Sequence, residues 1–167
     1  EFTGSGTTIR ITNSVFSAIS NPTIIFVCLA TDVNLDKVDF TNNTFNTHTN
    51  VEHTIFDSNA LSGDPLADGN AISQVIFRSN EIDYAASSAS YRSFRLRNVR
   101  NFIFEGNEGN YGGGMQAVID LINSTAYAYG NHVIALNGPL FNTTGTARLF
   151  LGPSTLDVRN TLGLVQS

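Results

Sequence analysis

The sequence of 167 residues has no tryptophan, one cysteine and one lysine, and only 14% of its residues are charged. A single cysteine cannot form a disulfide within one chain, and we expect Cys28, in the run "TIIFVCLA", to be a small buried residue. The net charge of −5 argues against the basic patch that a nucleic-acid partner would require. Because no stretch approaches the ~20 apolar residues of a membrane span, we also predict no membrane insertion.

Strong helix formers are sparse, and no long run shows apolar residues at the spacing of a helix. The apolar residues instead occur in short runs rich in Ile, Val, Phe and Thr, bounded by Asn, Gly, Ser and Asp. Such runs are typical of strands separated by turns. The sequence therefore predicts an all-β protein.

One short motif recurs five times: apolar residues two positions apart, two variable residues, a polar residue that is usually Asn, and a further strand-like segment. Its copies are "IRITNSVF" (9–16), "VDFTNNTF" (38–45), "VIFRSNEI" (75–82), "FIFEGNEG" (102–109) and "AYAYGNHV" (126–133). The aligned polar residues, at intervals of 24 to 37, are Ser14, Asn43, Asn80, Asn107 and Asn131. A longer apolar run follows each copy, namely "TIIFVCLA" (23–30), "VEHTIF" (51–56), "YRSFRLRN" (91–98), "MQAVIDLI" (115–122) and "ARLFL" (147–151).

None of these units can bury an apolar face alone, whereas stacked units cover one another. Stacking predicts two buried columns, one of Ile11, Phe40, Phe77 and Phe104, and the other of Phe16, Phe45 and Ile82. Asparagines stacked at the ~4.8 Å strand spacing can form a ladder of amide hydrogen bonds. Asn also tolerates left-handed backbone angles, so we expect the ladder residue itself to make the turn.

The motif resembles the right-handed parallel β-helix family, whose loose repeat is apolar-x-apolar-x-x-Asn-x-apolar, over about residues 7 to 135. The resemblance implies a solenoid of about five coils over residues 1–136. Residues 137–167 would then be the remnant of a last coil and a C-terminal cap or oligomer-contact tail. No capping helix precedes the first copy, so we expect the chain to be part of a longer protein or larger assembly, or its ends to be covered by partner subunits.

Stacking also predicts neighbours on the outside of the solenoid. Arg78 should lie beside Glu105 as an ordinary exposed ion pair. Glu81 should lie beside Glu108, and stacked carboxylates raise one another's proton affinity, as an acid/base pair requires. A separation near ~5 Å would suit a retaining glycosidase.

The candidate catalytic residues are Glu81, Glu108 and Asp83, and the candidate carbohydrate-binding residues are Tyr84, Tyr111 and His132. Aromatic rings beside carboxylates can hold a sugar, with its apolar faces on the rings and its hydroxyls on the acids. Three interpretations of this edge stay open: a solvated turn copied between adjacent units, a carbohydrate-contacting surface, or a catalytic pair. We predict no metal site and no cofactor, because the histidines lack metal-ligand spacing and no phosphate-binding glycine loop is present.

By resemblance, parallel β-helices act mostly on polysaccharides, in phage tailspikes and in pectin- and alginate-processing enzymes. Coils that are acidic, poor in lysine and rich in Asn, Thr and Ser look most like part of a tailspike. The resemblance implies a homotrimer, on the virion surface or extracellular, that binds host polysaccharide with or without degrading it. The alternatives are a secreted polysaccharide lyase or glycoside hydrolase, and a non-catalytic structural or adhesin solenoid. Whether the protein is an enzyme is left undecided by the sequence.

Overall fold

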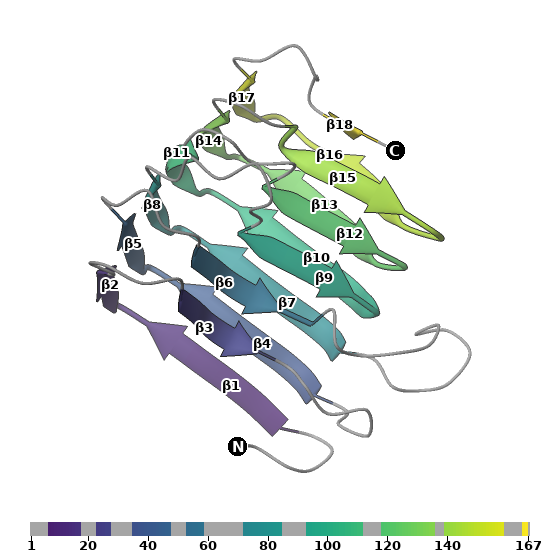
Figure 1. Ribbon diagram of the computed structural model, residues 1–167, viewed down its shortest axis with the longest axis horizontal. Helices are drawn as coiled ribbons and strands as arrows, with labels where there is room; N and C mark the ends of the chain where they lie inside the picture. Colours follow the sequence, from purple (N-terminus) through teal and green to yellow (C-terminus); the bar gives the residue numbers. More distant parts are fainter. Residues whose placement is uncertain are drawn as a thin grey trace.

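Three parallel β-sheets form the fold (Figure 1). The computed structural model describes residues 7–17, 23–27, 35–47, 53–58, 72–84, 93–111, 118–135, 139–158 and 165–166. Cys28 lies outside the described residues. Within them, every regular element is a strand and no helix occurs, so the predicted all-β class is confirmed.

Each sheet has six strands, and the sheets are named here in the order in which the chain visits them. The first sheet contains β1 (Thr7–Thr12), β4 (Leu35–Thr41), β7 (Ile72–Arg78), β10 (Val99–Glu105), β13 (Thr125–Tyr129) and β16 (Arg148–Leu151). The second contains β2 (Val15–Ser17), β5 (Thr44–Thr47), β8 (Glu81–Tyr84), β11 (Glu108–Tyr111), β14 (His132–Ala135) and β17 (Thr155–Val158). The third contains β3 (Thr23–Val27), β6 (His53–Asp57), β9 (Phe94–Arg97), β12 (Ile119–Ile122), β15 (Phe141–Thr144) and β18 (Val165–Gln166).

The chain passes from the first sheet to the second and the third and then begins again, so three consecutive strands make one unit. Each strand pairs in parallel with the equivalent strand of the neighbouring unit. This arrangement is compatible with a parallel β-helix. Residues beyond 136 contribute β15 to β18 to the same three sheets. No helix long and apolar enough to cross a membrane occurs in the described part of the chain.

The predicted core columns are confirmed by the register of the sheets. In the first sheet Ile11 pairs with Phe40, Phe40 with Phe77, and Phe77 with Phe104. The three phenylalanines are 0% exposed, and Ile11, on the edge strand, is partly buried against them. In the second sheet the other column is also formed, from Phe16, Phe45 and Ile82.

Phe77 is central to this core because rings from all three sheets surround it. Its ring centroid lies 6.0 Å from that of Phe40, 5.4 Å from Phe45, 4.8 Å from Phe94 and 5.9 Å from Phe104. Burying such a side chain stabilises the fold by about 1.5–3 kcal/mol, and ring pairs add to this. The core therefore joins the sheets as well as the units.

The asparagine ladder is also confirmed. The side-chain amide of Asn43 donates to Asn80 Oδ1 at 3.1 Å, that of Asn80 to Asn107 Oδ1 at 3.2 Å, and that of Asn107 to Asn131 Oδ1 at 2.9 Å. The same oxygens accept the main-chain N–H groups of the preceding ladder residues at 2.9–3.0 Å. These four side chains are at most 2% exposed, and a buried amide must be hydrogen-bonded to avoid a large cost.

The expectation that the ladder asparagine itself takes the left-handed conformation is wrong. The residue before it does so in the first five units, with φ between 51° and 65° at Asn13, Asn42, Ser79, Gly106 and Gly130. Most of these are Gly or Asn, which adopt this conformation at little cost. The ladder residue is thereby turned so that its side chain points along the stack.

A second expectation needs correction: "ARLFL" is not the fifth strand of the third sheet. It is β16, and it pairs with β13 in the first sheet. The third-sheet strand of that unit is β15, which pairs with β12. Its sequence, FNTT, has only one apolar residue, so the alternation of apolar and polar residues that identifies a strand is hardly visible there.

Candidate functional site

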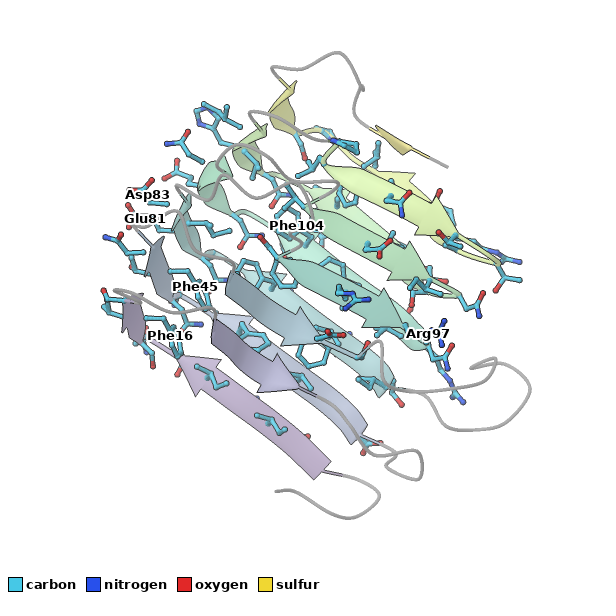
Figure 2. All side chains as sticks on the ribbon, viewed as in Figure 1. Phe16, Phe45, Glu81, Asp83, Arg97 and Phe104 are labelled. Atoms are coloured by element: carbon cyan, nitrogen blue, oxygen red, sulfur yellow. The ribbon has the colours of Figure 1, made fainter. Side chains whose placement is uncertain are left out.

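A hollow of about 390 Å³ lies on the outer face of the second sheet. Its lining is supplied by β8, β11 and β14 and consists of Glu81, Ile82, Asp83, Glu108, Gly109, Asn110, His132 and Ile134. Alternation along each strand produces this face, since successive side chains point to opposite sides of a sheet. Figure 2 shows Glu81 and Asp83 on the outside of the sheet, whereas Phe45 and Phe104 lie in the core.

Two columns of side chains run across the hollow. In the first, Glu108 pairs with Glu81 on one side and with His132 on the other, as predicted. In the second column, Asn110 lies between Asp83 and Ile134. Strands in a sheet lie about 4.8 Å apart, so each column presents its groups at the spacing of adjacent strands.

The hollow is acidic at neutral pH. Glu81, Asp83 and Glu108 are all exposed, as is His132, and the lining includes no lysine or arginine. Carboxylates accept hydrogen bonds, and Asn110 can both donate and accept them. A surface of this kind can bind a ligand rich in hydroxyl groups. Two carboxylates on adjacent strands also form the kind of pair that acid/base chemistry at a glycosidic bond uses.

The middle of the hollow depends on Gly109. Its φ is 136°, and a Cβ atom built there would lie 1.8 Å from the carbonyl oxygen of Ile82. No other residue fits this backbone without rearrangement. At the equivalent position the neighbouring strands carry Ile82 and Val133, which are buried in the core. Glycine therefore allows the backbones of β8 and β11 to approach closely beneath the acidic side chains.

The structure brings together four of the six predicted site residues, Glu81, Asp83, Glu108 and His132. The other two, Tyr84 and Tyr111, are the last residues of β8 and β11, and their side chains lie outside what the structure describes. Gly109, Asn110 and Ile134 line the hollow as well but were not predicted to belong to a site. A comparison of "EIDY" (81–84) with "EGNY" (108–111) could have identified Gly109, because glycine stands there in place of an inward-facing apolar residue.

The outer face of the first sheet pairs its charges. Arg78 and Glu105 form the predicted ion pair through Nε and Oε2, and this hydrogen bond raises the pKa of Arg78 above its ordinary value. Asp39 lies 3.1 Å from Lys37 Nζ and accepts a hydrogen bond of 2.6 Å from Thr41. Burial acts to raise the pKa of Asp39, but hydrogen bonds from Thr41 and Lys37 and nearby positive charge hold it below the ordinary value of 3.8.

Among the described residues, no group of three or more His, Cys, Asp or Glu side chains is placed to hold a metal ion. Comparison of the chain with protein-family models, with curated proteins and with solved structures gives no match.

Proposed function

We propose that the protein binds a polysaccharide through the hollow on the second sheet. The observation that carries the proposal is the hollow itself, lined by three carboxylates, an amide and an imidazole on adjacent strands. The apolar side chain of Ile134 lies beside these polar groups, and sugar sites combine both kinds of contact. Polar groups on three adjacent strands, Glu81, Glu108 and His132, would let an extended ligand make contacts along the stack.

The finer proposal is that the three sheets are the faces of a right-handed parallel β-helix that is part of a tailspike-like virion protein. In this proposal the chain is a homotrimer on the virion surface or in the extracellular space and binds polysaccharide of the host surface. The repeat and the ladder support it, because they match the loose repeat of that family. A secreted polysaccharide hydrolase or lyase would use the same hollow.

Catalysis is the second candidate, and the pairing of Glu81 with Glu108 favours it. One carboxyl group would protonate the leaving oxygen while the other acts as nucleophile or base. Asp83, in the neighbouring column, would help to hold the sugar. Glu81→Gln and Glu108→Gln should each abolish cleavage and leave binding nearly intact, because an amide keeps the shape but cannot transfer the proton.

Binding is tested by titration calorimetry with oligosaccharides from host-surface glycans. Tyr84→Ala and Tyr111→Ala should each weaken binding by about 1–2 kcal/mol, the scale of an aromatic contact. Asn110→Ala should weaken it by about 1 kcal/mol, the scale of a hydrogen bond. Asn101→Ala is the matched control, because Asn101 is also exposed but lies on β10 of the first sheet.

Unchanged affinity in the Tyr84→Ala, Tyr111→Ala and Asn110→Ala variants would remove the binding proposal. The face would then be the solvated outside of a structural or adhesin solenoid. Unchanged cleavage in both glutamine variants of a cleaving protein would remove the catalytic candidate and leave the binding proposal in place.

A further inference from the structure

Exposed apolar side chains gather at one end of the first sheet. Among the described residues, the exposed large apolar side chains are Val15, Tyr127, Tyr129, Phe150 and Leu151. Four of these five lie on the adjacent strands β13 and β16. Contiguous exposed apolar residues mark an interaction surface, whereas isolated ones do not.

β16 is the edge strand of the sheet, and its two exposed apolar side chains, Phe150 and Leu151, point to opposite faces. Leu151 pairs with Ala128 in the buried column of Phe104, yet it is 46% exposed. Phe150 stacks on Tyr127 with ring centroids 5.0 Å apart and planes within 10°, and it is 52% exposed. On inner strands such positions are covered from both sides. The exposed apolar side chains of β16 are therefore those expected of a strand that pairs with a further strand.

The opposite edge of the same sheet has matching features. It is formed by β1, as Figure 1 shows. Ile9 and Ile11 of β1 are partly buried in the inward columns. Arg10 points outward between them, and its side chain is 63% exposed even though Nε lies 3.6 Å from Asp39 Oδ2.

We propose that β16 of one copy of this chain pairs in parallel with β1 of a second copy, head to tail. In the register of the sheet, Leu149 would lie beside Ile9 of the second copy, Phe150 beside Arg10, and Leu151 beside Ile11. The two leucines would continue the inward columns. The Arg10 guanidinium would cover the outer face of the Phe150 ring, a favourable cation–π arrangement.

The ladder supports a second copy as the partner, because its two ends carry the same residue type. At one end the main-chain N–H of Asn131 donates to Ser154 Oγ at 3.3 Å. At the other end Ser14 occupies the equivalent position, and its main-chain N–H donates to Asn43 Oδ1 at 3.0 Å. In the joined stack, Ser14 Oγ of the second copy would occupy the next acceptor position beyond Ser154.

A head-to-tail contact differs from the side-by-side contact of a homotrimer. It uses two different surfaces on each copy, so association does not close and rods grow with concentration. The net charge of −5 on each copy opposes the contact, and added salt should promote it. The contact does not depend on the polysaccharide proposal.

Sedimentation velocity and electron microscopy of the full chain, over a dilution series at low and high salt, test this contact. The expected result is a mass that rises with concentration, and rods. Phe150→Lys should weaken association by about tenfold or more, because the ammonium would face Arg10 of the next copy. Arg10→Glu should also weaken it, whereas the control Arg100→Glu, the same charge change on the exposed outside of β10, should not.

The double variant Phe150→Lys with Arg10→Glu provides the sharpest test. It places opposite charges in register across the joint, so it should associate more tightly than either single variant. Circular dichroism checks that each variant is folded. A mass that stays constant over the series, an equal effect of Arg100→Glu, or no recovery in the double variant would each overturn the proposal. A closed trimer insensitive to Phe150→Lys would do the same.

Discussion

The outer faces of the first and second sheets carry their charges differently. On the first sheet, stacking places Arg78 beside Glu105 and Arg10 beside Asp39, which also lies near Lys37 of its own strand. On the second sheet, stacking places Glu81 beside Glu108, and the hollow around them includes no lysine or arginine. The register of parallel strands thus supports attraction on one face and repulsion on the other. The outer faces of a repeat can therefore differ in charge pattern while they share one core.

The largest expected effect tests whether the two faces share that core. Phe77→Ala removes a fully buried ring that contacts rings from all three sheets, and it should lower the free energy of unfolding by about 3–5 kcal/mol. Urea denaturation measures this loss, and unfolding should remain a single transition. A loss below about 1 kcal/mol would mean that the ring is not buried as described.

The next effect concerns the hollow alone. Gly109→Ala should lower the free energy of unfolding by about 2 kcal/mol or more, because the new Cβ overlaps the backbone of Ile82. Gly106→Ala is the matched control, since its φ is 60° and the nearest atom to a new Cβ is 3.7 Å away. It should cost only about 1 kcal/mol. Equal losses in the two variants would show that β8 and β11 are not in close approach.

On the first sheet, Asp39→Asn should lower stability at neutral pH by about 1–2 kcal/mol, since charged hydrogen bonds are lost. The pKa of Asp39 is depressed in the folded state, so its contribution is present above the ordinary value of 3.8. That contribution is lost as the pH falls through 3.8 and then through the lower folded pKa. Denaturation curves of both proteins should therefore converge in acid. A difference that persists unchanged in acid would exclude this charge as its cause.

The smallest effects should differ in sign between the two faces. Glu105→Gln removes an attractive partner of Arg78 and should lower stability by well under about 1 kcal/mol. Glu81→Gln removes a like charge beside Glu108 and should raise stability by about 0.2–0.5 kcal/mol. Both are measured at low salt, and both should shrink at high salt. The same sign in both variants would show that register does not determine the electrostatics of these faces.

The sequence predicted the features that depend on repetition. The ladder, the phenylalanine columns and the pairing of Arg78 with Glu105 all follow once the motif is aligned, because parallel stacking places equivalent positions side by side. The second-sheet register of Glu81, Glu108 and His132 follows in the same way.

The features that could not be predicted depend on local backbone geometry. The identity of the left-handed residue was missed because Asn fills both turn positions in "TNNTF", and only φ distinguishes them. The strand Phe141–Thr144 was missed because its core position is marked by one apolar residue. The stacking of the acids was predicted but the hollow was not, since the close approach at Gly109 is a property of the folded backbone.

The asparagine ladder has a consequence for how the molecule opens. Each ladder amide donates a hydrogen bond to an adjacent unit, and its oxygen accepts from the preceding unit in the contacts between Asn43, Asn80, Asn107 and Asn131. Stability in such an array is a sum of nearest-neighbour couplings, so fraying starts at the ends and propagates inward. The amide proton of Asn80, with ladder asparagines on both sides, should then exchange with solvent more slowly than that of Ser14. The ladder makes each unit the template on which the next one orders.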